Sequence, residues 1–151
     1  MHVNSMNNMK KFKERYVQDG WSILDIGSLC VRNHECYKSI FEKHNYDGMD
    51  IVPGKNVDIV GFDNIKKQYD VVISGQVMEH VKRPWEWLSS LTKYFSKYIC
   101  IIAPNTFKEH KYPIDTYRYF PDGMRDLFEY ANINIVEILK SNTDTIGIGA
   151  K

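Results

Sequence analysis

Short apolar runs alternate with helix-like segments along this chain, and that alternation constrains the fold more than any other feature. Such runs are typical of buried strands, and they occur at 21–26, 46–51, 57–60, 69–74 and 97–103. Strands that alternate with helices predict a parallel α/β sheet with helices on both faces. Two last strands, near 133–139 and 145–150, have no helix between them, so we expect an antiparallel final pair.

The segments between these runs have helical spacing or helix-start signals. We predict helices at about 6–18, 35–44, 84–95 and 121–130. Pro84 suits the first turn of its helix, because the missing N–H of proline has no hydrogen-bond partner there anyway. Residues 104–120 are expected to form a long loop. With 151 residues and no linker or repeat, we expect one domain spanning 1–151.

The charge balance argues against a dedicated nucleic-acid-binding protein, because 20 basic and 19 acidic residues leave a formal net charge of only +1. No apolar run approaches the ~18 residues of a membrane span. The polar N-terminal segment also lacks the apolar region of a signal peptide. We therefore expect a cytoplasmic protein that has no membrane partner.

The chain has three cysteines, Cys30, Cys36 and Cys100, which form no Cys-x-x-Cys pair. An odd number leaves one cysteine unpaired in any disulfide scheme. This pattern favours a reducing compartment and argues against a zinc site. We accordingly expect no metal ligands.

The turn after the first strand carries the first functional signal. The strand ends in Leu24-Asp25-Ile26-Gly27-Ser28, and a glycine there lets the backbone turn sharply and approach a ligand. In open α/β sheets, ligands bind beyond the carboxyl ends of the strands. Asp50 ends the second strand, 23 positions after Gly27. An acidic residue at about that spacing accepts hydrogen bonds from the ribose hydroxyls of a bound nucleotide.

The residues after Gly27 indicate which nucleotide fits. A dinucleotide site needs further glycines, so that backbone N–H groups can surround a pyrophosphate. Here Leu29 and Val31 occupy that loop, and no second glycine follows. S-adenosylmethionine carries no phosphate, so it fits a loop without these glycines better than a dinucleotide does. A nicotinamide-dependent oxidoreductase is the competing enzyme class.

Several motifs in order resemble the class I S-adenosylmethionine-dependent methyltransferases. Residues 24–28 match the first family motif, 46–51 the second, and 69–74 followed by Val77-Met78-Glu79-His80-Val81 the motif of the fourth strand. The resemblance covers residues 21–150. It implies a Rossmann-like, doubly wound, mostly parallel sheet of seven strands with an antiparallel last strand and S-adenosylmethionine as cofactor.

The same resemblance implies which residues hold the methionine end of the cofactor. Asp25, Gly27 and Ser28 belong to the motif that lines this end, although Asp25 could instead cap the next helix. Gly75 and Gln76 would lie beside the methyl donor.

By the same family pattern, Asp50 would bind the ribose, Ile51 would flank the adenine, and Asp63 would reach the adenine amino group. Glu79 and His80 are better explained as a helix-capping pair than as catalytic groups.

The loop 104–120 should meet the substrate, since loops beyond strand ends carry function in this architecture. Its segment His110-x-x-Pro113-x-Asp115-x-x-Arg118 resembles a signature of small methyltransferases associated with glycan and polysaccharide biosynthesis. That resemblance suggests O-methylation of a sugar or another small polar acceptor. We assign His110 as general base, because the ordinary pKa of histidine, about 6.5, suits proton transfer at neutral pH.

Asp115 could orient His110, and Arg118 could bind a phosphate or carboxylate on the acceptor through two parallel hydrogen bonds. An ion pair between the two that only stabilises the loop is an equally good explanation. A non-catalytic S-adenosylmethionine-binding regulatory module and a nucleic-acid methyltransferase remain alternatives. The chain lacks long insertions that would cap a substrate pocket, so a partner protein, a second subunit and an open cleft are the alternatives for the acceptor site.

Overall fold

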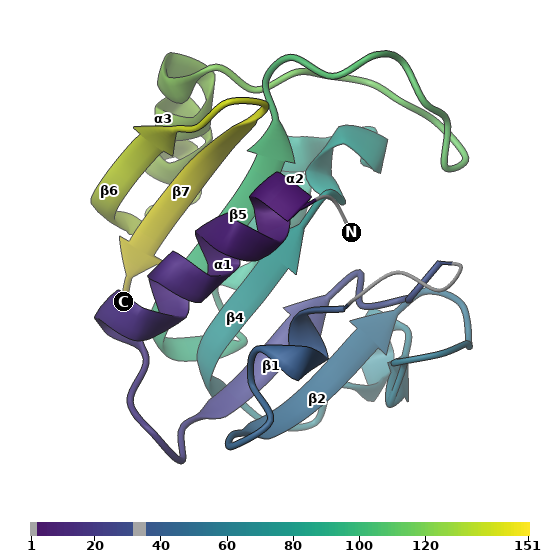
Figure 1. Ribbon diagram of the computed structural model, residues 1–151, viewed down its shortest axis with the longest axis vertical. Helices are drawn as coiled ribbons and strands as arrows, with labels where there is room; N and C mark the ends of the chain where they lie inside the picture. Colours follow the sequence, from purple (N-terminus) through teal and green to yellow (C-terminus); the bar gives the residue numbers. More distant parts are fainter. Residues whose placement is uncertain (1–2, 32–35) are drawn as a thin grey trace.

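The computed structural model describes residues 3–31 and 36–151, and these form one sheet of seven strands (Figure 1). The strands are β1 (Ser22–Ile26), β2 (Asn45–Asp50), β3 (Ile59–Val60), β4 (Tyr69–Gly75), β5 (Phe95–Pro104), β6 (Asn134–Lys140) and β7 (Asp144–Ala150). Their order across the sheet is β3-β2-β1-β4-β5-β7-β6.

Strands β1 to β5 pair in parallel, whereas β7 is antiparallel to both of its neighbours, β5 and β6. The predicted mostly parallel sheet with an antiparallel last strand is thereby confirmed. From β1 the chain builds the sheet outward to β2 and β3, then returns to the other side of β1 to form β4. Such a reversal leaves a crevice for a ligand at the carboxyl ends of the strands.

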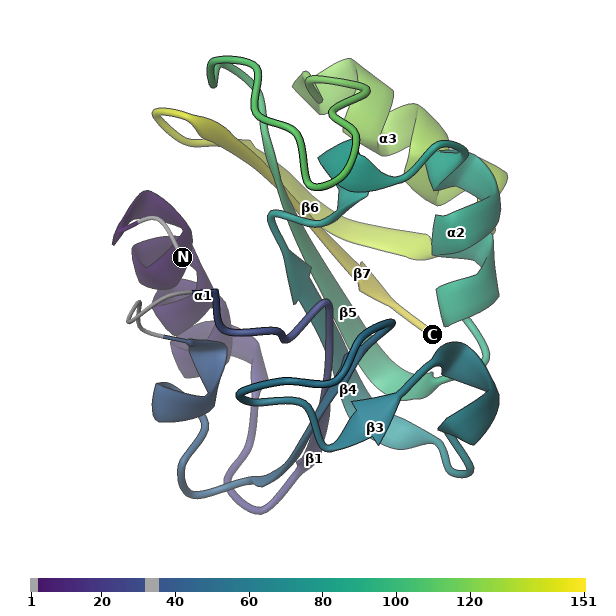
Figure 2. The same cartoon turned by 90° about the vertical axis from the view of Figure 1, so that its right-hand side faces the viewer.

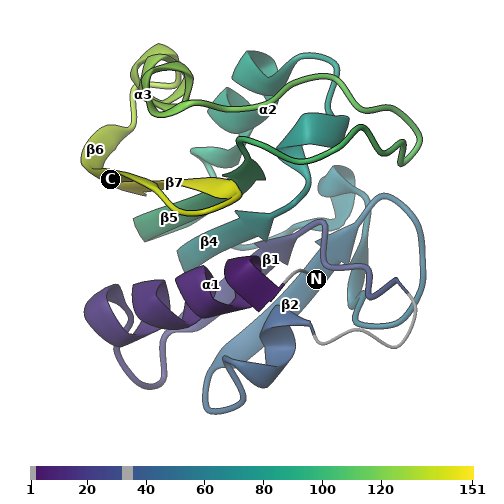
Figure 3. The same cartoon turned by 45° about the horizontal axis from the view of Figure 1, so that its top comes forward.

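Helices cover both faces of the sheet, as predicted (Figures 2 and 3). The helix α1 (Val3–Tyr16) and the short 3₁₀ turn η1 (Tyr37–Ser39) lie on one face, and α2 (Pro84–Leu91) and α3 (Pro121–Tyr130) lie on the other. Successive side chains of a strand point to opposite faces. Ile23 therefore packs in the core beneath α1, while Leu24 packs in the core beneath α2 and α3.

Two helix predictions need correction. The helix expected at 35–44 is only the 3₁₀ turn η1, because Cys36 is extended (φ −115°, ψ 158°) and the chain enters β2 at Asn45; Glu35 lies outside the described residues. The helix expected at 84–95 ends at Leu91, because the chain must already be extended at Phe95 to pair with Tyr69 of β4.

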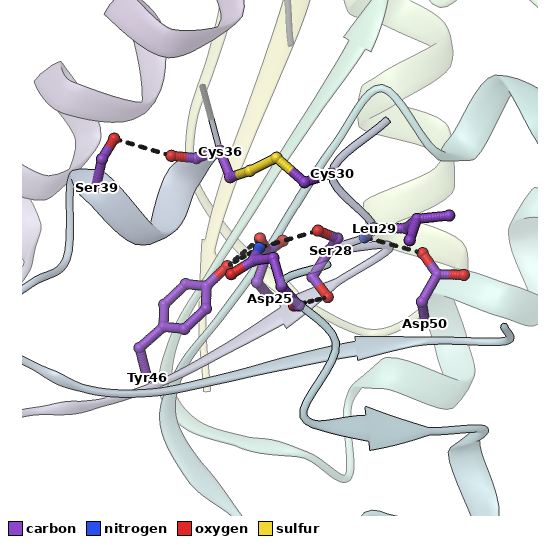
Figure 4. Close-up of a disulfide and its surroundings, with 9 residues drawn as sticks. Asp25, Ser28, Leu29, Cys30, Cys36, Ser39, Tyr46 and Asp50 are labelled. Atoms are coloured by element: carbon purple, nitrogen blue, oxygen red, sulfur yellow. Dashed lines mark hydrogen bonds between the residues drawn. A yellow bond between two sulfur atoms is a disulfide. The ribbon is translucent and has the colours of Figure 1, made fainter. Parts of the chain in front are cut away.

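The expectation of reduced cysteines is wrong for Cys30 and Cys36, which form a disulfide beside the loop that follows β1 (Figure 4). Their Cα atoms are 6.0 Å apart, within the range that a disulfide spans. Counting cysteines could not show that the chain folds back here to bring the two together. Cys100 is free and buried. The cysteine pattern therefore no longer supports a reducing compartment.

Within the described ranges, no helix is both long and apolar enough to cross a membrane. The helices instead pack their apolar side chains into the hydrophobic core. In α3, Phe128 is fully buried and packs so closely on Gly147 of β7 that a Cβ at that glycine would lie 2.6 Å from the phenyl ring.

Phe128→Ala should lower the free energy of unfolding by about 3–5 kcal/mol, because it removes a buried ring and leaves a cavity beneath α3. Urea denaturation followed by circular dichroism measures the change. Tyr130→Ala on the same helix is the matched control, since Tyr130 is 60% exposed, and it should cost less than about 1 kcal/mol. Equal losses in the two variants would contradict this packing.

Candidate functional site

A cavity of about 780 Å³ lies where β1, β2 and β4 end. This volume falls within the range of small-molecule sites. The lining is mostly apolar and includes Met49, Ile51, Val52, Phe62, Val77 and Trp87. Gly27, Asp50 and Gln76 line it from the strand ends, and His80 and His110 line it from two later segments.

Gly27 turns the chain out of β1 with a φ of +80°, a conformation that L side chains rarely adopt. A Cβ at this position would clash with the side chain of Val77. The turn is held because the Gly27 amide donates to the carbonyl of Met49 in β2, at 2.8 Å. Gln76, at the end of β4, also has a positive φ of 60°. Both strand ends therefore adopt special backbone conformations at the cavity wall, as is common at functional sites.

Asp50 ends β2 at the cavity and orders the neighbouring backbone. Its Oδ2 accepts a hydrogen bond from the Leu29 amide at 3.1 Å (Figure 4). Its Oδ1 accepts one from the Ile51 amide at 2.7 Å. Oδ1 also accepts a longer hydrogen bond from the Val52 amide, at 3.4 Å. Because a carboxylate has about four acceptor sites, one site remains free for a hydroxyl donor of a ligand, and a second donor would replace the long contact from Val52.

The structure brings Gly27, Asp50, Ile51 and Gln76 together around the cavity, and the other four predicted cofactor residues do not line it. Ser28 Oγ instead donates to the Asn56 carbonyl at 2.8 Å. Gly75 is buried where a Cβ would clash with the Tyr37 hydroxyl group. Asp63 is exposed in the 3₁₀ turn η2 (Phe62–Asn64). The roles assigned to these residues from the sequence stay predictions.

Asp25, the fourth of them, lies beneath the loop rather than in the cavity. It is 3% exposed, and its Oδ2 accepts a hydrogen bond from the Tyr46 hydroxyl (Figure 4). The pKa of the Asp25 carboxyl is raised to about 7, mainly by burial and in part by the nearby Asp50, while the hydrogen bond from Tyr46 opposes the rise. Asp25 is therefore a buried group held by Tyr46 of β2 outside the cavity.

The loop 104–120 runs past the carboxyl end of the sheet and is organised around Arg118 (Figures 2 and 3). The guanidinium of Arg118 donates to both carboxylate oxygens of Asp115, at 2.6 and 2.7 Å. It also donates to the carbonyls of Phe107, Tyr117 and Lys108. The Arg118 guanidinium holds the pKa of the Asp115 carboxyl well below its usual range.

Neither Asp115 nor Arg118 lines the cavity, but the pair positions a residue that does. The Oδ2 of Asp115 accepts a hydrogen bond from the His110 amide at 2.6 Å and lies 3.6 Å from His110 Nδ1. The three residues assigned to catalysis from the sequence therefore contact one another in the order Arg118, Asp115, His110. Of the three, only His110 lines the cavity.

Glu79 and His80 join His110, a grouping that sequence reasoning missed. They end the 3₁₀ turn η3 (Met78–His80), and the Nε2 atoms of His80 and His110 lie 3.7 and 4.0 Å from Glu79 Oε1. The loop is tied to this turn because the Thr116 amide and hydroxyl both donate to the Glu79 carbonyl, at 2.7 and 2.8 Å. The one feature of the sequence that could have indicated this grouping is the pair Glu79-His80, which follows soon after the end of β4.

The Glu79 side chain is fully buried, and neither carboxyl oxygen has a hydrogen-bond partner among the described residues. Burial raises the pKa of the Glu79 carboxyl to about 8. Burial also lowers the pKa of His80, and its Nδ1 lies 2.6 Å from the Ile114 carbonyl. Glu79 does not line the cavity itself, but its neighbours His80 and His110 do. A carboxyl that is buried without a partner among the described residues and lies next to cavity-lining groups is a candidate functional group.

The sequence matches no protein-family model and no curated protein. Solved structures do share its fold. A S-adenosylmethionine-dependent methyltransferase from Aquifex aeolicus is 16% identical, with a TM-score of 0.68 over 98% of this chain and 91% of that one. Magnesium protoporphyrin IX methyltransferase from Synechocystis, with bound S-adenosylhomocysteine, is 12% identical, with a TM-score of 0.68 over 97% and 81%.

A third similar structure is the N-terminal domain of EvdMO1 in the presence of S-adenosylhomocysteine and D-fucose. It is 15% identical, with a TM-score of 0.64 over 99% of this chain and 83% of that one. At such identities the likeness shows a shared fold. The chain has the Rossmann-like fold of the class I S-adenosylmethionine-dependent methyltransferases, as its motifs implied.

The buried state of Asp25 predicts a pH-dependent stability. Its pKa is about 7 in the folded chain and about 3.9 in unfolded chains. Unfolding therefore releases a proton between these values, so this group lowers the stability as the pH rises from about 4 to about 7. The side chain of Asp25→Asn cannot ionise, so the variant does not lose this stability. Between pH values of about 4 and about 7, its free energy of unfolding, relative to that of the native chain, should therefore rise by a few kcal/mol.

Urea titrations at several pH values measure this difference. Asp126→Asn, at an exposed position of α3, is the control. Its free energy of unfolding should change with pH in parallel with that of the native chain. A parallel curve for Asp25→Asn as well would show that Asp25 is ionised in the folded chain at low pH.

Proposed function

We propose that this protein is a S-adenosylmethionine-dependent methyltransferase that methylates a hydroxyl oxygen of a small polar acceptor, such as a sugar or glycan precursor. The observation that carries the proposal is a single cavity with two different walls. Gly27, Asp50 and Gln76 form the wall at the strand ends, and His80 and His110 lie on the other.

The wall at the strand ends suits a nucleoside that carries an amino-acid chain. Asp50 has a free acceptor site for one ribose hydroxyl and can accept the other in place of the long Val52 contact. The apolar side chains of Ile51 and Phe62 flank a space for the adenine ring. Gly27 and Gln76 lie where the methionine end would bind. S-adenosylmethionine supplies a methyl group on a positively charged sulfur.

The opposite wall suits a hydroxyl-bearing acceptor. His110 Nδ1 lies 3.2 Å from the Lys108 carbonyl, so the neutral ring donates there and leaves Nε2 with a lone pair that can take a proton. Asp115 and Arg118 act as positioning residues for this ring. Phe107 and Tyr112 line the same part of the cavity, and aromatic rings shield a reacting centre from water.

A sugar acceptor has two supports. The segment that contains His110, Asp115 and Arg118 resembles the signature of methyltransferases of glycan biosynthesis. In addition, the structure of the N-terminal domain of EvdMO1, which shares this fold, was solved in the presence of D-fucose. The mostly apolar lining and the near-neutral net charge favour a small molecule over a nucleic acid.

Isothermal titration with S-adenosylmethionine should show binding, and Asp50→Asn should weaken it about tenfold or more. The reason is that hydrogen bonds to a charged acceptor contribute about 1.5–3 kcal/mol. Asp126→Asn, an acid-to-amide change on an exposed part of α3, should bind like the native chain. No binding at millimolar ligand would overturn the proposal.

His110→Ala should abolish or greatly slow methyl transfer while the affinity for S-adenosylmethionine changes little, because His110 lies on the acceptor side. Release of S-adenosylhomocysteine with D-fucose and a panel of sugar nucleotides measures turnover. Glu109→Ala is a control from the same loop, because the Glu109 side chain is 72% exposed and does not line the cavity. Full turnover of His110→Ala with the true acceptor would refute the role of this histidine. Cofactor binding without turnover of any acceptor by the native chain would favour a non-catalytic module.

A further inference from the structure

We propose that Glu79, His80 and His110 form a binding site for a divalent transition-metal ion of the Zn²⁺ type at the acceptor wall of the cavity. The sequence led us to expect no metal ligands, and that expectation rested on the cysteines alone. The proposed ligands are instead two imidazole nitrogens and one carboxylate oxygen, and they come from segments 30 residues apart (80 to 110).

The three groups are close enough to share one ion. One ligand atom from each residue lies within 4.8 Å of the others. Ligand atoms at the usual Zn–N and Zn–O distances lie about 3.4 Å apart around a tetrahedral ion. The groups would therefore draw together by roughly 1 Å to bind. His110 is the more exposed of the two histidines, at 25% against 14% for His80, so most of this adjustment is expected at His110.

The orientation of both imidazole rings suits metal binding. Nδ1 of His80 lies 2.6 Å from the Ile114 carbonyl, and Nδ1 of His110 lies 3.2 Å from the Lys108 carbonyl. A carbonyl only accepts, so in each neutral ring the proton resides on Nδ1 and Nε2 carries the lone pair. Both Nε2 atoms face Glu79. Metal-binding histidines characteristically donate their other nitrogen to a backbone carbonyl or carboxylate in this way.

Glu79 supplies the strongest reason to expect a cation. Buried carboxyl groups are normally hydrogen-bonded, paired with a charge or bound to a metal. Both oxygens of this one lack a hydrogen-bond partner within the described residues. The nearby cation, Arg118, cannot fill the role, because all five of its N–H groups are engaged by Asp115 and three backbone carbonyls.

The donor set also selects the class of ion. Imidazole nitrogens suit zinc, iron, nickel and copper, whereas Mg²⁺ and Ca²⁺ prefer oxygen ligands. Two histidines and one carboxylate are a ligand set of catalytic zinc sites, which leave a further position open. Because His80 and His110 line the cavity, that open position would face the acceptor.

The role of such an ion in catalysis rests on the proposed function, whereas the site itself does not. An acceptor hydroxyl bound to the ion becomes more acidic, so its O–H bond breaks and the proton passes to solvent water. The oxygen then forms a bond to the methyl carbon while the carbon–sulfur bond breaks and its electron pair stays on sulfur. With the ion bound, His110 is a ligand and not a general base. The ion then promotes the loss of the hydroxyl proton by lowering the pKa of the hydroxyl group.

The test is titration of the chelator-treated protein with Zn²⁺ alone, without cofactor or acceptor. We expect one ion per chain, and Glu79→Gln and His110→Ala should each bind at least tenfold more weakly. Glu109→Gln is the matched control, since this carboxylate lies in the same loop with its side chain 72% exposed, and it should bind like the native chain. No binding, or binding by Glu79→Gln as tight as that of the native chain, would overturn the site.

Two further measurements keep the result interpretable. Melting curves without Zn²⁺ identify any variant that fails to fold, and ¹⁵N NMR of the native chain tests the ligands directly. Zn²⁺ should shift the Nε2 signals of two histidines, and excess Mg²⁺ should not reverse the shift. Unchanged histidine signals in the presence of bound Zn²⁺ would also refute the site.

The two proposals can fail separately. Binding of S-adenosylmethionine without Zn²⁺ binding refutes only the metal site, and the converse refutes only the proposed function. If both bind, turnover that is lost with a chelator and restored by Zn²⁺ supports the ion as activator of the acceptor. Turnover that persists in the chelator assigns that task to His110 as base.

Discussion

The parallel pairing of β1 with β4 is the constraint on which the rest of the structure depends. Because β1 also pairs with β2, the winding of the chain reverses beside it, and the loops after these strands diverge at one edge of the sheet. That divergence makes the cavity possible. It also explains the local chemistry at the strand ends, where Gly27 must turn with positive φ and Asp50 fixes the amides of its own loop and of the neighbouring one.

The wall of the cavity that contains His110 depends on Arg118, a side chain whose N–H groups are all hydrogen-bonded. Arg118 uses every N–H it has to hold Asp115 and three carbonyls, and so gives an otherwise irregular loop a defined shape. The carboxyl of Glu79, beside this loop, has no hydrogen-bond partner among the described residues, and an unsatisfied buried polar group costs about 1–3 kcal/mol. The proposed metal site accounts for that cost, because it gives the carboxylate a cation to bind.

Much of the fold could be predicted from the sequence, and four of the eight residues assigned to the cofactor line the cavity, for identifiable reasons. Gly27 and Asp50 were predictable because a turn glycine and an acid at strand ends have a characteristic spacing. Asp25 belongs to the same motif, yet it lies outside the cavity, because alternation places it on the same side of β1 as Ile23, towards α1. The residues 35–44 had helical spacing, but the extended Cys36 and the entry into β2 left room for one turn only.

The sequence by itself determined the α/β architecture, because apolar runs buried on both faces can only be strands of a helix-covered parallel sheet. It also indicated that Gly27 and Asp50 lie together at the strand ends, where they line the cavity. Only the tertiary structure decided that Cys30 meets Cys36 and that Glu79 and His80 meet His110. The second contact joins a loop and a short turn whose paths are set by hydrogen bonds of Arg118 and Thr116 to backbone carbonyls. Backbone carbonyls are present at every position, so no residue pattern reveals which of them a side chain will find.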